Sequence, residues 1–210
     1  MKSYLSFCLV FLLAGTGALA HQPVIVGQET ITIEKPEISR AFYHELSGRP
    51  RSYFITADQP FDLYLNLLVP KKTNASGRYS AHIFRLENGQ RNLLAEVRAG
   101  AVVWQEFYEP FGGDYYVKGP EFKSNVPAGR YEIEVFSADN RGKYVLAVGE
   151  KEYFGPKEIA GVYTEVPKLK GEFFGGNPLS FLLTPFGLVL VVAAGVVIYL
   201  LYRANGRIKA

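Results

Sequence analysis

The chain has 210 residues, and its 23 lysines and arginines exceed its 20 acidic residues by three. The excess comes from four basic residues near the two ends: Lys2, Arg203, Arg207 and Lys209. Residues 21–180 carry 19 basic and 20 acidic residues, so the composition predicts no basic surface for nucleic acid. The one cysteine, Cys8, lies outside this segment, which excludes disulfides, cysteine-ligated zinc and thiol catalysis from it.

Residues 1–20 have the layout of a secretory signal peptide. Lys2 is followed by an apolar run at residues 5–13 and then by the small-residue sequence Ala18-Leu19-Ala20. A basic start, an apolar centre and a small-residue cleavage site in this order are typical of exported proteins. We therefore predict cleavage after Ala20 and an exported mature chain that begins with His21.

Residues 21–150 have the pattern of a series of short strands. Residues 61–69 alternate between apolar and other side chains, and residues 131–135 repeat the pattern. Asn88-Gly89 marks one hairpin, and residues 139–142 mark the turn of another. Such strands, without a long amphipathic helix, predict a mainly β fold: an antiparallel, jelly-roll-like β-sandwich that forms one extracytoplasmic domain. We expect its outward strand faces to be charged or small and to offer no concavity.

Residues 151–180 differ in composition and form a predicted juxtamembrane connector. Prolines at first helical positions favour two short helical turns, over residues 156–163 and 167–174. Two placements are open for Phe173 and Phe174. Either they dip into the membrane interface, or they pack back onto the sandwich.

Residues 181–202 are a second uncharged run, 22 residues long. At about 1.5 Å per residue, a helix of this length reaches roughly 33 Å, enough to cross a hydrocarbon core about 30 Å thick. The basic residues in segment 203–210 favour a cytoplasmic tail, because positive charge is retained on the inner side of membranes. We predict a single-pass plasma-membrane protein that contacts the lipid bilayer through this helix and holds its N-terminal domain outside.

Two stretches of the sequence, residues 128–135 and 142–149, resemble the closing hairpin of bacterial pre-peptidase C-terminal modules. The first has that family's Gly-x-Tyr start followed by alternating apolar residues, and the second has its Gly, Tyr and Leu spacing. Residues 53–57 and 61–64 also suit the family, so the resemblance covers residues 42–149. It implies a jelly-roll-like sandwich with an accessory or binding role, here without a catalytic domain, and it carries over no catalytic residue.

His21 is the first candidate metal ligand. As a mature N-terminal residue it joins an α-amine to an imidazole, a pair that chelates Cu(II), and a second histidine would complete the site. That second ligand would be His44 or His82. Both alternate with apolar side chains in their strands, which is also the pattern of a histidine packed into a core. Two interpretations therefore remain open: His21 forms a copper site with a second histidine, or the three histidines are unrelated to one another.

Residues 104–122 concentrate aromatic and acidic side chains, and the pairs Gly112-Gly113 and Gly119-Pro120 predict that this stretch is looped. Exposed rings beside carboxylates can stack against sugars, and carboxylates with loop carbonyls can hold Ca²⁺. The ligand-binding candidates are Trp104, Tyr108, Asp114, Tyr115 and Tyr116. The alternative is that these rings cover one open end of the sandwich.

The sequence lacks serine nucleophile elbows, Walker loops, HExxH motifs and dinucleotide-binding fingerprints. We therefore predict a non-enzymatic, membrane-anchored extracytoplasmic module that binds an envelope protein or a glycan, or helps to assemble an envelope complex. We predict no cofactor other than Ca²⁺ or Cu(II) bound at the candidate sites above. The alternative function is a copper-binding protein or oxidase subunit that uses His21.

Overall fold

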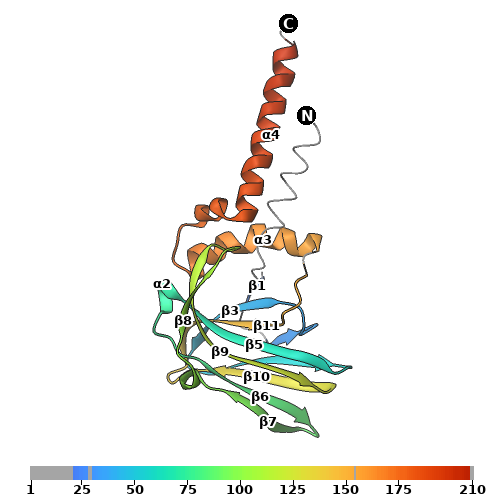
Figure 1. Cartoon of the computed structure of the whole chain (residues 1–210), viewed down its shortest axis with the longest axis vertical. Helices are drawn as coiled ribbons and strands as arrows, with labels where there is room; N and C mark the ends of the chain where they lie inside the picture. Colours follow the sequence, from blue (N-terminus) through green and yellow to red (C-terminus); the bar gives the residue numbers. More distant parts are fainter. Residues whose placement is uncertain (1–20, 28–29, 154, 209–210) are drawn as a thin grey trace.

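The computed structural model describes residues 21–27, 30–153 and 155–208, so the predicted signal peptide lies outside the described residues. Two β-sheets pack face to face, and helix α3 (Pro156–Lys168) lies over one of them as a third layer (Figure 1). Helix α4 (Pro185–Ile208) projects away from these layers. The predicted mainly β sandwich with one C-terminal apolar helix is confirmed.

The first sheet has six strands in the order β1 (Gln22–Ile25), β3 (Arg40–Ser47), β11 (Arg141–Val148), β5 (Phe61–Pro70), β9 (Asp114–Val126) and β8 (Gln105–Glu109). The second has five, in the order β2 (Ile31–Ile33), β4 (Arg51–Ala57), β10 (Gly129–Phe136), β6 (Ser80–Glu87) and β7 (Gln90–Val97). Two short helices, α2 (Lys71–Asn74) and η1 (Ala99–Ala101), follow β5 and β7.

Both sheets are mixed and not wholly antiparallel as predicted. The edge strand β1 pairs parallel to β3, and β2 pairs parallel to β4, while the other described pairs of named strands are antiparallel. Strands β1 to β4 alternate between the two sheets along the chain. Because no hairpin joins β1 to β3 or β2 to β4, neither pair is forced to be antiparallel.

The inner faces of the two sheets form the main hydrophobic core, as the alternation in β5 predicted. Leu63, Leu65 and Leu67 of β5 are fully buried on this face. Inside the same core, the hydroxyl groups of Tyr53 and Tyr144 hydrogen-bond to each other at 2.7 Å and join the two sheets. This bond lets two large rings fill the core without leaving a buried polar group unpaired.

The two predicted turns have different outcomes. Asn88 and Gly89 have φ values of 52° and 77°, the left-handed conformation of a tight hairpin turn, and they join the paired strands β6 and β7. The turn at residues 139–142 leads instead from β10 in the five-stranded sheet to β11 in the six-stranded sheet. The predicted hairpin is wrong there. The local sequence indicates a turn but does not determine which strand the segment after the turn will pair with.

Both predicted stretches of the connector are helical, but the first extends through Pro167 and is not separated from the second. Helix α3 has Pro156 at its start and contains Pro167 in its last turn, where a proline removes only one terminal hydrogen bond. A π-helical turn, η2 (Leu169–Phe173), and a 3₁₀ helix, η3 (Pro178–Leu183), follow it. Val162 and Val166 lie one turn apart and pack with the buried Phe181, which gives α3 an apolar face to bury.

Part of the outward face of the six-stranded sheet is apolar, which corrects, for that part, the prediction that outward strand faces are charged or small. Tyr43, Leu68 and Tyr116 are buried there in a second hydrophobic cluster with Phe173 and Phe174. The Tyr43 ring meets those of Phe173 and Phe174 edge to face, with centroids 5.1 and 6.2 Å apart. Of the two placements left open, the phenylalanines therefore pack back onto the sandwich.

Helix α4 begins at Pro185, four residues after the predicted start of the membrane span. The hydroxyl of Thr184 accepts a hydrogen bond from the Gly187 N–H at 3.2 Å, a helix cap with proline at the first helical position. The segment Pro185–Asn205 is long and apolar enough to cross a membrane, and it is the one such helix among the described residues.

Candidate functional site

The connector covers only part of the outward face of the six-stranded sheet. Beside the covered part lies a cavity of about 450 Å³, a volume typical of small-ligand sites. We call this cavity the cleft. Four apolar residues on β3, β5 and β11 form its floor: Ala41, Leu68, Val145 and Ala147. Eight polar or tyrosine side chains also line it: His21, Tyr43, Tyr64, Asn66, Tyr108, Glu109, Tyr116 and Lys118.

Small side chains in the central strands create the cleft. Ala41 and Ala147 are direct neighbours in the register of β3 and β11, so two adjacent positions in the middle of this face carry only a methyl group each. The sequence holds a signal for this face, because residues 144–148 of β11 form an unbroken apolar run. Such runs are typical of strands buried on both faces, so this run is the sequence signal for a covered outward face.

A pair of tyrosines stands in the wall of the cleft. The hydroxyl groups of Tyr43 and Tyr116 lie 2.8 Å apart and hydrogen-bond to each other. Burial raises the pKa of both phenols above the ordinary value, so both keep their hydroxyl hydrogens at neutral pH. Their mutual bond uses one of the two hydrogens, and the other can be donated to an acceptor in the cleft.

Two acidic residues at the β8–β9 turn are held by structural contacts. The carboxylate of Glu109 accepts hydrogen bonds from the N–H groups of Phe111 and Gly112, at 2.7 and 2.6 Å. Burial raises the pKa of Glu109, and these two bonds act in the opposite direction. The turn is therefore closed by its own side chain.

The second acidic residue, Asp114, forms an ion pair with Lys170 of the connector. The Nζ of Lys170 lies 3.1 Å from Oδ2 of Asp114, and the lysine side chain is only 3% exposed. Burial raises the pKa of Asp114, and the neighbouring Lys170 opposes that rise. The pair ties η2 to the start of β9 and was not predicted from the sequence, where the two residues are far apart.

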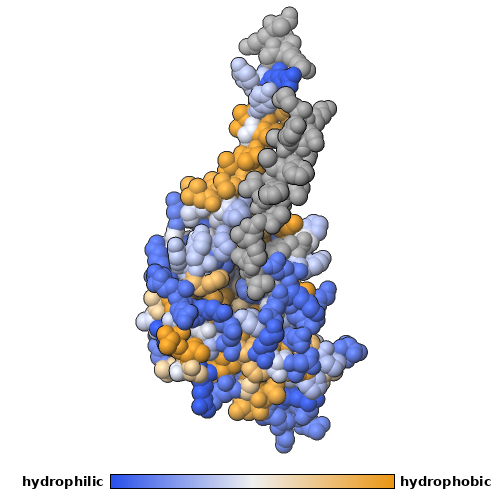
Figure 2. All heavy atoms as spheres, in the orientation of Figure 1, coloured by the Kyte–Doolittle hydropathy of each residue, from blue (hydrophilic) through white to orange (hydrophobic). Residues whose placement is uncertain are grey.

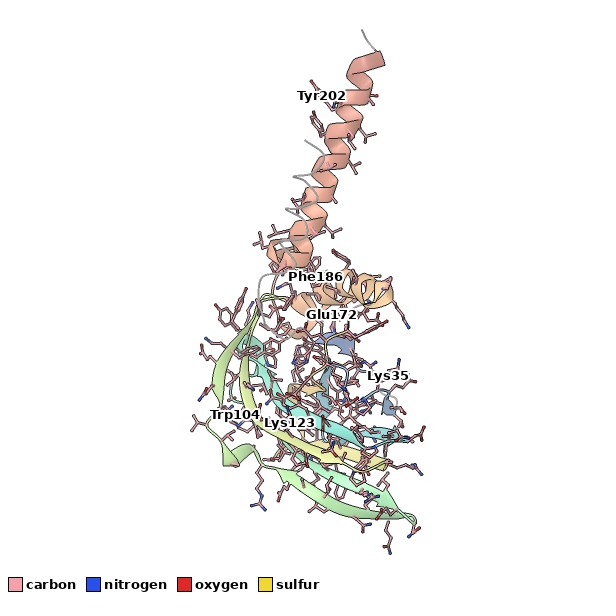
Figure 3. All side chains as sticks on the ribbon, turned by 45° about the vertical axis from the view of Figure 1, so that its right-hand side comes forward. Lys35, Trp104, Lys123, Glu172, Phe186 and Tyr202 are labelled. Carbon is pink, nitrogen blue, oxygen red and sulfur yellow. The ribbon has the colours of Figure 1, made fainter. Side chains whose placement is uncertain are left out.

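The five predicted ligand-binding residues do not form one group. Tyr116 and Tyr108 line the cleft, and Asp114 is engaged by Lys170. Tyr115 is 55% exposed beside Tyr108, with the two ring centroids 4.8 Å apart. Figure 3 shows Trp104 on the lower part of the sheets, far from Phe186 at the base of α4.

The Trp104 ring is held by contacts within the sandwich. A Cβ atom added at Gly119 would lie 2.4 Å from the indole ring, so the ring packs directly on the β9 backbone. The indole Nε1 donates a hydrogen bond to the Ala99 carbonyl at 3.0 Å. The guanidinium of Arg78 covers the ring, 5.1 Å from its centroid. These contacts match the alternative prediction, in which this ring covers one end of the sandwich.

The three histidines lie in different places. Nδ1 of His21 is 2.5 Å from the Ser39 hydroxyl, and His21 lines the cleft. His44 packs edge-on against Tyr144, with ring centroids 5.9 Å apart. His82 lies on β6 of the other sheet, 3.6 Å from a carboxylate of Glu96 and from one of Glu134. Among the described residues, no group of three His, Cys, Asp or Glu side chains is placed to hold a metal ion.

The partly buried His21 predicts a pH-dependent stability. Burial lowers its pKa from 6.5 to about 4, with Glu152 opposing and Lys118 adding to the shift. Above pH 6.5 His21 is neutral in both the folded and the unfolded chain, and the unfolding free energy has its full value. Between pH 6.5 and pH 4 the imidazole is protonated in the unfolded chain before it is protonated in the folded one, so the unfolding free energy falls. We expect the wild-type domain to lose up to about 3 kcal/mol of unfolding free energy over this range relative to His21→Asn, measured by urea denaturation. Equal pH profiles for the two proteins would contradict the prediction.

Solved structures similar to this chain match it at low sequence identity and low TM-score. Neither protein-family models nor curated proteins match the sequence. One similar solved structure is the pre-peptidase C-terminal domain of a collagenase from Bacillus anthracis, at 15% identity and a TM-score of 0.38, over 59% of this chain and 96% of that one. The resemblance predicted from the sequence is thus found again in the structure, as a distant similarity of fold.

Two further structures are similar at lower scores. The surface-associated copper-binding protein CorA of Methylomicrobium album BG8 matches at 7% identity and a TM-score of 0.32, over 61% of this chain and 100% of that one. A β-glucosidase from Paenibacillus barengoltzii matches at 11% identity and a TM-score of 0.25, over 64% of this chain and 14% of that one. At these identities the matches concern the fold alone.

Proposed function

We propose that the protein is a non-enzymatic binding module that is anchored in the plasma membrane by α4 and holds its ligand in the cleft. The observation that carries this proposal is the cavity of about 450 Å³ on the six-stranded sheet, beside the connector and lined by apolar residues of three strands. The rest of the same face is covered by Phe173 and Phe174, as expected for apolar surface in water. A ligand in the cleft would complete that cover.

The lining indicates the chemistry of the ligand. The floor of Ala41, Leu68, Val145 and Ala147 favours an apolar body, and the Tyr43–Tyr116 pair offers a hydrogen-bond donor at its side. Such a combination of apolar surface and a few placed polar groups is usual for small-ligand sites. We infer a ligand with an apolar body and one hydrogen-bond acceptor.

The acidic residues near the cleft support a binding role over catalysis. Glu109 closes its own turn through two backbone N–H groups, and Asp114 is paired with Lys170. General acid–base catalysis needs groups that are free to exchange a proton with the substrate. Both carboxyl groups are already engaged in holding the β8–β9 turn and the connector.

Export and topology complete the proposal. The leader-like residues 1–20 and the basic residues after the apolar helix support an outside location for the sandwich and a cytoplasmic end for α4. In this arrangement α3 lies between the six-stranded sheet and the membrane, as Figure 1 shows for the order of the layers. The cleft then opens outside the cell, close to the bilayer.

The ligand can be found by photo-crosslinking in cells. Phe107 lines the cleft and is 40% exposed, which leaves room for the additional benzoyl group when p-benzoylphenylalanine replaces it. We expect irradiation to give one discrete adduct, identified by mass spectrometry. The matched control carries the same photoreactive residue at Val103, which is 83% exposed and does not line the cleft.

A second substitution tests whether the adduct depends on the floor. Ala147→Leu places three more carbon atoms in the cleft and should abolish crosslinking at position 107 while the protein remains folded. The absence of an adduct at position 107, or the same adduct at position 103, would contradict the proposed binding site.

A further inference from the structure

We propose that η3 docks on the lipid bilayer beside α4, so that the protein meets the membrane through two contacts. The docking surface consists of Leu179, Leu182 and Leu183, which we call the leucine patch. This inference rests on the proposed membrane anchoring by α4 and adds a second contact to it. Its consequence is a fixed orientation of the sandwich, and of the cleft, relative to the bilayer.

The leucine patch is exposed to an extent that a water-facing surface rarely tolerates. Leu179 is 69% exposed, Leu182 37% and Leu183 80%, all within one helix of six residues. Clusters of exposed apolar side chains on a folded domain mark contact surfaces. In Figure 2 the apolar surface runs along α4 to its base, where η3 joins it.

The position of the patch selects lipid as the partner. Leu183 is separated from Pro185, the first residue of α4, by Thr184 alone. The apolar segment Pro185–Asn205 has 21 residues, and at about 1.5 Å each a helix of this length fills a hydrocarbon core about 30 Å thick. Its first residue then lies at the boundary of the hydrocarbon, which places the patch at the level of the headgroups and the upper acyl chains.

The corner between η3 and α4 is too tight for the patch to turn away from the bilayer. A Cβ atom added at Gly187 would lie 2.0 Å from the Phe181 carbonyl oxygen, so the two backbones touch. The Thr184 hydroxyl also donates to that carbonyl at 2.7 Å while it accepts from the Gly187 N–H.

The other side of η3 is held by the connector. Phe181 is 3% exposed and packs with Val162 and Val166 of α3, so this helix has one buried and one exposed apolar face. The Asn177 side chain accepts a hydrogen bond from the Leu179 N–H at 2.9 Å and fixes the start of η3. The exposed face therefore points away from α3 with little freedom.

The test measures the depth of single positions in lipid. The full chain with Cys8→Ser is placed in lipid nanodiscs, and one cysteine labelled with bimane replaces Leu183, Leu190 or Val103 in turn. Leu190 is 42% exposed on α4 and reports spanning, whereas Val103 lies on the sandwich and reports water. The quencher is a phospholipid with a nitroxide near the headgroup end of its acyl chain.

We expect the label at position 183 to be quenched by the nitroxide lipid, as the label at position 190 is, and the label at position 103 to be unaffected. A label at Leu179→Cys repeats the measurement independently in case the first variant is not folded. Quenching at position 190 with none at 183 and 179 would overturn the docking and leave the anchor intact. Absence of quenching at position 190 would overturn the anchor itself, and the docking with it.

Discussion

Leu65→Asp is expected to abolish folding of the sandwich. Leu65 lies in the middle of β5, on the inner face, and is fully buried in the main core. A carboxylate at this position would have no partner, and burying such a group costs several kcal/mol, against total stabilities of about 5–15 kcal/mol for typical domains. The variant should show no cooperative thermal transition by circular dichroism, whereas the wild-type domain should show one.

The matched control places the same charge on an exposed strand position. Leu93 on β7 is 57% exposed, so Leu93→Asp should change the unfolding free energy by less than about 0.5 kcal/mol. A cooperative transition in Leu65→Asp at the wild-type temperature would contradict the inward direction of the apolar face of β5.

Lys170→Met is expected to destabilise the domain by about 3–5 kcal/mol, the usual effect of removing one partner from a buried ion pair. Methionine keeps most of the length and apolar volume of the lysine side chain, so the loss is mainly one of charge. Asp114 would lose its ion-pair partner, while Glu109, a second carboxyl group whose pKa is raised by burial, lies close to it. Urea denaturation of the exported domain with its connector measures the difference.

The double variant Lys170→Met with Asp114→Asn separates the charge effect from packing. Because it removes both charges, it should be clearly more stable than Lys170→Met alone, with a coupling energy of about 1–3 kcal/mol. Lys168→Met is the matched control, since the Lys168 side chain is 57% exposed and lies 3.9 Å from Glu165. Equal effects at positions 168 and 170 would contradict a structural role for the buried pair.

Much of the fold could be predicted because strands and helices leave periodic patterns in the sequence. The alternation of residues 61–69 predicted the inner face of β5, and Asn88-Gly89 predicted the β6–β7 hairpin. The uncharged run predicted an apolar helix, with its start four residues too early. That error has a local cause: Phe181 is as apolar as the residues of the helix, and only its packing against α3 removes it from the span.

The candidate site could be predicted only in part. Tyr108 and Tyr116 do line the cleft, but Trp104 and Tyr115 were grouped with them only because they are close in sequence. Sequence neighbours on a strand point to opposite faces, so Tyr115 and Tyr116 separate as soon as β9 forms. Tyr43 and Lys170, which complete the cleft wall and the ion pair, come from distant segments and carry no motif.

The sequence alone determined most of the strands, the apolar helix, and which faces of β5 and β10 are buried, because these follow from short-range periodicity. It did not predict β1, and β9 lies largely in the stretch of residues 104–122 that was wrongly predicted to be looped. Only the tertiary structure decided which strands are neighbours, that the residue 139–142 turn crosses between sheets, and that the connector covers the six-stranded sheet. These features depend on contacts between residues far apart along the chain. An apolar run such as residues 144–148 predicts that a strand is buried on both faces. It does not predict which segment covers the outward face. In the fold that segment is η2 with the following residue, which place Phe173 and Phe174 there.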